Sequence, residues 1–298
     1  FLNQNNNNNL DDIIIDFNKV FLNSGIFFNI KSHSKLNIRI LHNTSDNFTI
    51  FQNNFINFKK NCEVQLEDHF NLTCNSINNI NYNTNVEEGS VIKHNIFQNF
   101  SNSNKLYLTS NIVCDKNSSY YQNTYNFSEG FVRNFHHANL NGEFANVSLK
   151  GCFFLKGKNV CSNKTNIIHN AEHCVSDQTY KGILNDHSKA NYFSNTFVSE
   201  NAQKTEGYQL SKGVLLTDNC SFFSKPELRI YADDVKCSHG STIGPVDESA
   251  LFYLRSRGIS KNEAMKMIIS SFIKEDLQSL DENIAILVSN NLSDYLKA

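Results

Sequence analysis

The chain has 298 residues, enough for one large domain or two ordinary ones, and none of its apolar runs is long enough to span a bilayer. Its 27 basic and 29 acidic residues give a net charge of -2, and no basic block indicates a nucleic-acid partner. Asparagine is abundant, proline occurs only 2 times and tryptophan never, a bias that reflects AT-rich codons rather than function. The chain begins with Phe1, so we expect a fragment or a processed form.

Residues 1–19 form an asparagine-rich segment, and "NQNNNNN" at 3–9 is expected to be disordered because it has nothing to bury. From about residue 20 to 238, short apolar-alternating stretches such as "GIFFNI" and "KLYLTS" alternate with polar turns, which is typical of strands. So many strands could form a sandwich, a barrel or a solenoid. Their number and the asparagines, which can form ladders between stacked coils, favour a β-helix over residues 20–244.

The pattern becomes helical over residues 245–298. Asp247 is a natural N-cap for a first helix that ends before Gly258, and Ser260 to Glu263 is a capping box that opens a second helix. The second helix is expected to place on one face Ala264, Met267, Ile268 and Phe272. A third helix carries at helical spacing Ile284, Leu287, Val288, Leu292 and Tyr295. Three short helices cannot bury all this apolar surface by themselves.

Eight cysteines are spread along the chain without CxxC pairs. In a chain of this length they are more typical of buried, reduced thiols than of a disulfide framework, although a secreted, disulfide-bonded protein is the alternative.

The stretch "YADDVKCSHGSTIG" at 231–244 concentrates residues that can do chemistry. On an extended strand Cys237 and His239 project from the same face, about 6.6 Å apart. Two ligands leave a metal half-coordinated, since zinc or iron needs about four. A strand end with a buried thiol and a hydrogen-bonded imidazole fits this pattern equally well.

Two other histidine stretches are not predicted to form sites. His169 and His173 in "IIHNAEHC" would share a face only on a helix, and no helix is predicted there. His136 and His137 should point to opposite faces of a strand. The residues alone therefore predict no self-contained active site.

The stretch "KPELRIYADDVKCSHGSTIGPVDESALFYLRSRGISKNEAMKMII" resembles the C-terminal signature of the SufB/SufD family, in particular its SufD branch. "VRNFHHANLNGEFANVSLKG", "EHCVSDQTYKGIL" and "NAQKTEGYQLSKGVLLTD" resemble further family segments, in the same order. The resemblance implies a mainly β protein, with a right-handed parallel β-helix core and a small C-terminal helical region. It also implies a non-enzymatic scaffold subunit of the SUF complex for iron–sulfur cluster assembly.

The same resemblance implies partners and site residues. Such a subunit pairs with a SufB-type paralogue through the end of the β-helix and binds a SufC-type ATPase through its C-terminal helices. An iron–sulfur cluster would form transiently at the junction and be shared with the paralogue, with His239 as a ligand and Cys237 beside it. Reduced flavin is the expected reductant on the whole complex. The residues expected at the ATPase interface are Phe252, Tyr253, Arg255, Arg257, Met265 and Ile268.

The AT-rich bias together with this family suggests the stroma of a relict plastid (apicoplast), or the cytosol for a bacterial source. Two alternatives remain open: an extracellular β-helix protein that acts on polysaccharides, and a stand-alone zinc hydrolase that uses Cys237 and His239.

Overall fold

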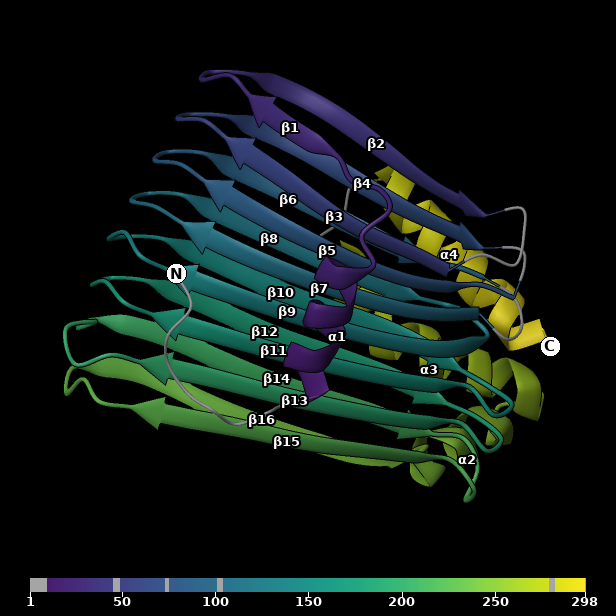
Figure 1. Ribbon diagram of the computed structural model, residues 1–298. Helices are drawn as coiled ribbons and strands as arrows, with labels where there is room; N and C mark the ends of the chain where they lie inside the picture. The colour runs from purple at the N-terminus through teal and green to yellow at the C-terminus, as the bar shows by residue number, and fades with distance from the viewer. Residues whose placement is uncertain (1–9, 45–48, 73–74, 101–103, 279–281, 298) are drawn as a thin grey trace.

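Sixteen parallel strands dominate the computed structural model, which describes residues 10–44, 49–72, 75–100, 104–278 and 282–297. Successive strands alternate between two eight-stranded sheets, so that one strand from each sheet makes one coil of a right-handed parallel β-helix (Figure 1). This confirms the predicted fold class. The first sheet contains β1 (Phe27–Ile30), β3 (Thr49–Phe58), β5 (Ile77–Val86), β7 (Asn104–Cys114), β9 (Gly130–Leu140), β11 (Val160–His169), β13 (Lys189–Val198) and β15 (Ser221–Ile230). The second contains β2 (Lys35–Thr44), β4 (Glu63–Leu72), β6 (Val91–Gln98), β8 (Ser119–Asn126), β10 (Asn146–Leu155), β12 (Val175–Leu184), β14 (Thr205–Leu215) and β16 (Val235–Pro245).

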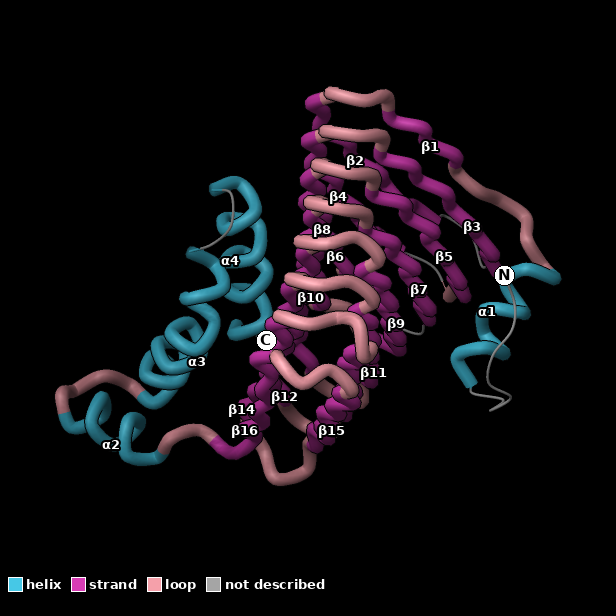
Figure 2. Tube along the Cα trace, turned by 90° about the vertical axis from the view of Figure 1, so that its left-hand side faces the viewer, coloured by secondary structure: helices cyan, strands magenta, loops and turns pink. Residues whose placement is uncertain are grey.

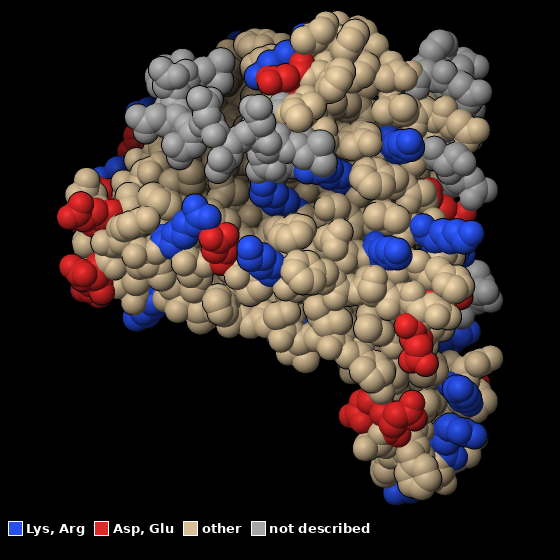
Figure 3. Space-filling model, turned by 60° about the horizontal axis from the view of Figure 1, so that its bottom comes forward, with Lys and Arg blue, Asp and Glu red and all other residues tan. Residues whose placement is uncertain are grey.

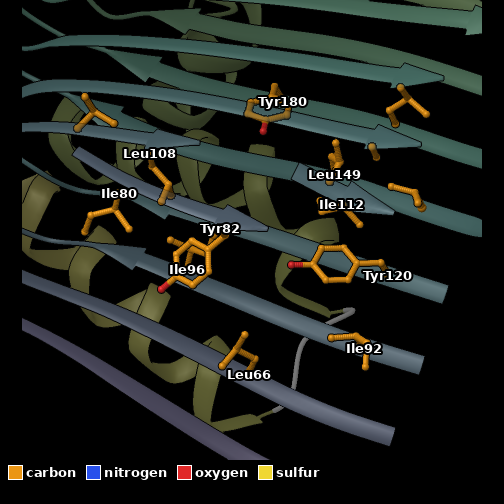
Figure 4. Close-up of a cluster of buried hydrophobic side chains, with 14 of the residues drawn as sticks. Leu66, Ile80, Tyr82, Ile92, Ile96, Leu108, Ile112, Tyr120, Leu149 and Tyr180 are labelled. Atoms are coloured by element: carbon orange, nitrogen blue, oxygen red, sulfur yellow. The ribbon is translucent and has the colours of Figure 1, made fainter. Parts of the chain in front are cut away.

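The interior of the solenoid is built by the period-2 alternation of each strand. Aliphatic and aromatic side chains from both sheets point inward and stack coil upon coil (Figure 4). Tyr82, Tyr120 and Tyr180 are among the largest fully buried side chains. Because every strand pairs in register with the strand one coil away, a given row of the interior is filled by residues that are far apart in sequence.

Asparagine ladders connect the coils, as the sequence predicted. On the outer face of the first sheet, Asn83 donates to Asn53 over 2.7 Å and Asn111 donates to Asn83 over 3.3 Å. Asn170 donates to Asn141 over 2.8 Å at a turn. The ladders thus occupy strand faces as well as corners, because an amide that both donates and accepts can repeat along a stack of coils.

The sequence reasoning did not anticipate a helix before the first strand. Helix α1 (Leu10–Val20) lies against β3 and β5. Asn18 is fully buried there and donates to the carbonyl oxygen of Asn79 over 2.6 Å, while the Asn79 amide donates to the carbonyl of Ile14 over 3.0 Å. These hydrogen bonds fix a segment whose composition alone indicated no structure. The predicted disorder at 3–9 lies outside the described residues.

The C-terminal helices begin and end where the capping residues predicted. They are α2 (Glu248–Ser256), α3 (Lys261–Gln278) and α4 (Glu282–Lys297). The Asp247 side chain accepts from the backbone N–H groups of Ser249 and Ala250, and Gly258 takes a φ of 84° just after α2. At the start of α3 the Glu263 backbone N–H donates to the Ser260 hydroxyl over 3.3 Å, and the Ser260 backbone N–H donates to the Glu263 carboxylate over 3.3 Å, which confirms the capping box.

Helices α3 and α4 bury their apolar face on the outer face of the second sheet (Figure 2). The helix residues in this cluster are Ile269, Ile273, Val288 and Leu292, and they pack on Phe97, Tyr125, Cys152, Phe154 and Ile183. Ala264 is buried as predicted, but Met267 is 50% exposed, so the buried face of α3 is rotated from the one predicted. The side chain of Ile284 lies outside the described residues. The second sheet therefore buries the apolar side chains that the helices could not bury by themselves.

Cysteines do not cross-link the solenoid. Seven of them are free thiols, six of these are buried, and Cys74 lies outside the described residues. Burial raises the pKa of Cys114 and Cys161 to about 12, which keeps both thiols protonated and unreactive at neutral pH.

A charged group is fully buried near the first coils. Asp68 accepts from His42 over 2.9 Å, from His94 over 2.6 Å and from the Tyr82 hydroxyl over 2.8 Å. Burial alone would raise the pKa of this carboxyl, but the hydrogen bonds from the two histidines outweigh it and hold the pKa well below its usual range. Tyr120 extends the cluster through the other ring nitrogen of His94, at 2.7 Å. The Asp68 carboxylate on β4 thus connects β2 and β6 of its own sheet with β5 of the other sheet.

Two interior histidines make the fold sensitive to acid. Burial lowers the pKa of His169 from 6.5 to about 4 and that of His136 from 6.5 to about 3. Below pH 6.5 the unfolded chain binds protons that the folded chain does not, so stability present above pH 6.5 is lost as the pH falls toward these lower values. The depressed pKa of Asp68 acts in the same direction at lower pH.

We predict that His169→Gln flattens this pH dependence. Removing one buried titrating group should reduce the loss of unfolding free energy between pH 6.5 and pH 4 by about 3 kcal/mol, although the variant can be less stable at pH 7. Urea unfolding at several pH values measures the slope. His187→Gln, at an exposed turn position, is the control and should keep the wild-type slope. Parallel curves for wild type and His169→Gln would contradict the assignment.

Candidate functional site

The last coil leaves one end of the solenoid open. Among the described strands, β15 pairs only with β13 and β16 only with β14, so each presents an unpaired parallel edge. Figure 3 turns this end toward the viewer: much of the surface is uncharged, and the helical part protrudes at the lower right. Exposed aromatic side chains lie here, with Phe223 54% and Tyr231 63% exposed. An open edge with apolar side chains is suited to pairing with another chain.

Cys237 and His239 lie together on this last strand, as predicted. Cys237 is in register with Gly207, and His239 is in register with Gln209. Gly207 and Gln209 both face the solenoid interior, so the thiol and the imidazole share the inward row of β16. No further coil covers them among the described residues. Cys237 is half-buried and His239 is exposed at the open end.

The thiol has a partly apolar setting. Cys237 packs against a small cluster of Val198, Ala202 and Ala232. Burial raises the pKa of the Cys237 thiol, and the Gly207 backbone opposes this weakly. A β-carbon at Gly207 would lie 3.3 Å from the sulfur, so the glycine leaves the space that the thiol occupies. Metal ligation would require loss of a proton that this environment tends to retain.

The neighbouring charged residues belong to other surfaces. Asp234 and Asp233 lie in the turn before β16, and Asp234 pairs with Lys204 across the turn. Lys236 faces outward and lies 3.1 Å from the Glu206 carboxylate. The two aspartates therefore do not join Cys237 on the strand.

The other histidines lie apart from this end. His169 is buried at the end of β11, with its Nε2 2.8 Å from the Ser176 hydroxyl, whereas His173 lies in a turn and stacks on Phe144. His136 faces the interior and His137 the exterior, as predicted. Within the part of the chain that the structure describes, no group of three or more His, Cys, Asp or Glu side chains could hold a metal ion. Cys237 and His239 would thus need ligands from elsewhere.

Sequence reasoning missed the polar floor below His239. Gln209 and Ser211, both almost fully buried, lie one coil deeper and face the same interior. They could have been found only by aligning the coils, which repeat every 26 to 32 residues without a shared motif.

Of the residues predicted to face the ATPase, the four on α2 or directly after it are exposed. Phe252 is 74% and Tyr253 58% exposed on α2. The Arg257 guanidinium lies 5.4 Å from the centre of the Tyr253 ring, and Arg255 is also exposed. Met265 lines a pocket of about 360 Å³ between α2, α3 and the end of β14. Ile268 is half-buried and thus contributes less to the surface.

No helix in the described part of the chain is both long enough and apolar enough to cross a membrane.

Comparison with known proteins gives a family match over most of the chain. Residues 40–272 match the model of the SufBD core domain of the SUF system for FeS cluster assembly. The iron–sulfur cluster assembly protein SufD of Escherichia coli is 38% identical over 146 residues, which is 49% of this chain and 34% of that protein. SufD of Plasmodium falciparum is 31% identical over 136 residues, which is 45% of this chain and 9% of that protein. The chloroplastic protein ABCI7 of Arabidopsis thaliana is 40% identical over 105 residues, covering 35% of this chain and 22% of that protein. The chain thus matches about a third or less of the length of these relatives.

Proposed function

Because this chain belongs to the SufB/SufD family of the SUF iron–sulfur cluster assembly system, and is of SufD type, we propose that it is a non-catalytic scaffold subunit that completes a cluster-assembly site with a SufB-type paralogue. One observation carries the proposal: Cys237 and His239 share the inward row of the last strand, at an open end of the solenoid. A half-set of ligands at an unpaired strand edge is what a site shared between two subunits requires.

In this proposal the nascent cluster is the cargo. A neutral imidazole nitrogen of His239 binds iron, and its exposure lets a partner bring further ligands to it. Cys237 has the secondary role, because its half-buried thiol retains its proton. The bond-making steps would involve iron and sulfide supplied to the junction. This chain contributes a ligand and a surface.

The SufC-type ATPase would act through the helical region. Only Val246 and Asp247 separate the end of β16 from the start of α2, so a displacement of α2 pulls directly on the strand that carries His239. Helices α3 and α4 are fixed on the second sheet, which gives α2 a rigid base. ATP hydrolysis in the partner could thereby open or rotate the junction.

We also propose where this chain acts and what supplies electrons to the complex. The similarity to SufD of Plasmodium and to a chloroplastic protein supports a plastid stroma, such as that of an apicoplast. Reduced flavin on the assembled complex would supply electrons. The alternatives of an extracellular polysaccharide-acting protein and of a zinc hydrolase find no support in the family match.

We predict that His239→Ala abolishes cluster accumulation on the complex without affecting its assembly. The side chain is exposed, so its loss should leave the solenoid folded, whereas the shared site loses a ligand. The measurement is iron and sulfide content, with visible absorbance, of the complex purified after co-expression with its SufB-type and SufC-type partners. Cys237→Ser should have a smaller effect. His187→Ala removes an exposed histidine from a turn elsewhere and is the matched control. Wild-type cluster content in His239→Ala would remove the histidine from the mechanism.

Exposed residues of α2 and its C-cap provide a separate test of the proposed ATPase interface. Tyr253→Ala together with Arg257→Ala should weaken binding of the SufC-type ATPase by about ten-fold or more, since exposed tyrosine and arginine are typical hot-spot residues. Titration of the ATPase against the folded variant measures this, with circular dichroism as the test of folding. Arg39→Ala, on β2 at the opposite end of the solenoid, is the control. An unchanged dissociation constant would place the ATPase elsewhere.

A further inference from the structure

The interior row that ends at His239 contains two buried glutamines in successive coils. Gln178 on β12 is in register with Gln209 on β14, which is in turn in register with His239 on β16. The side-chain amides of both glutamines donate to the Thr196 hydroxyl, over 2.7 Å from Gln178 and over 2.8 Å from Gln209. Thr196 thus bridges the two amides, and His239 occupies the next register position of the same row.

The amide of Gln209 has a defined orientation. Its nitrogen also donates to the backbone carbonyl of Glu227 over 3.1 Å. A carbonyl can only accept, so the amide nitrogen must face it, and a flipped side chain would set its oxygen against the Glu227 carbonyl. Both amide hydrogens are therefore committed, and Oε1 is left as an acceptor on a side chain that is only 3% exposed.

That acceptor is unused. Gln209 Oε1 is buried and has no hydrogen-bond partner among the described residues. One coil deeper the corresponding oxygen of Gln178 accepts from the Thr165 hydroxyl. The residue in register with Thr165 on the next coil is Ser194, and its hydroxyl also lacks a partner in the described chain. The side-chain oxygen of Gln178 thus has a hydrogen-bond donor, whereas that of Gln209 has none among the described residues.

A buried acceptor without a partner is destabilising, so its presence in a native fold calls for an explanation by function or by a bound group. The imidazole of His239, in the adjacent register position, is exposed and makes no hydrogen bond to the described residues. In-register neighbours in a parallel sheet lie about 4.8 Å apart, so an inward-turned imidazole N–H can reach a glutamine oxygen.

We propose that Gln209 is a positioning residue for His239: its fixed amide oxygen accepts the inner N–H of the imidazole, so that the other nitrogen presents its lone pair to the partner subunit. This inference rests on the proposed function of His239 as a ligand. Metal-binding histidines generally donate their second nitrogen to a carbonyl or carboxylate, which selects the tautomer and the orientation of the ring. Gln209 supplies that acceptor from the floor of the open end.

The test compares Gln209→Met with Gln178→Met in the complex co-expressed with its SufB-type and SufC-type partners. Methionine keeps the length of glutamine but has no comparable acceptor, and both variants lose an amide from the same row and a hydrogen bond to Thr196. Only Gln209 adjoins His239. We expect Gln209→Met to lower iron and sulfide content about ten-fold or more, the usual effect of losing such a partner, and Gln178→Met to change it little. Gln209→Glu keeps an acceptor next to the imidazole and should recover part of the content.

His239→Ala in the same assay separates the two levels of the proposal. A normal cluster content in His239→Ala would overturn the proposed function and this inference with it. His239→Ala can lose the cluster while the two glutamine variants have equal effects, or while Gln209→Met has no effect. Either result would overturn the role of Gln209 alone.

A second measurement is made on the wild-type complex. Nitrogen-15 NMR of the wild-type complex labelled at histidine, with His239 assigned from the spectrum of His239→Ala, reports the tautomer of the imidazole. One dominant neutral tautomer is expected from a fixed acceptor. An even mixture of the two tautomers would contradict the proposal.

Discussion

Parallel, in-register pairing of successive coils determines the architecture of this protein. Each strand within the stack satisfies its backbone groups with the strands one coil before and one coil after it, and only the strands at the two ends of each sheet do not. A parallel edge cannot be closed by a tight hairpin, so the stack ends in unpaired strands wherever the coils stop. The end formed by β15 and β16 therefore follows from the fold itself, and the proposed ligands occupy the last inward row that this stacking creates.

The same stacking connects the two proposed interfaces. Helices α3 and α4 pack on the outer face of the sheet whose last strand is β16. Helix α2 follows β16 after a two-residue link and keeps its aromatic side chains exposed. A force applied to α2 can thus reach the open end through one strand, while the body of the sheet stays fixed by its core.

Local sequence rules predicted the local features well. Alternation gave the strands, and Asp247, Gly258 and the pair of Ser260 and Glu263 defined the helix ends, because capping depends on residues within one turn. The shared face of Cys237 and His239 followed from strand period alone. The family resemblance supplied the reason for attending to them.

Features that depend on register between coils could not be predicted in this way. Asp68 contacts histidines from the coils on either side, and Gln209 lies next to His239 although 30 positions separate them in the sequence. Helix α1 is held against the solenoid by tertiary hydrogen bonds, such as that from Asn18 to the Asn79 carbonyl 61 positions away. The site was therefore predictable as a pair of residues on a strand, but its buried floor was not.

We propose that the end formed by β15 and β16 is completed by a paralogous partner. Hydrogen–deuterium exchange of the chain, alone and bound to its SufB-type paralogue, tests it most directly, since backbone amides on an open edge exchange until another strand or surface covers them. The account predicts that partner binding protects amides of β15 and β16 and leaves β1 and β2, at the opposite end, unchanged. Protection confined to β1 and β2, or a stable complex with no added protection at β16, would contradict it.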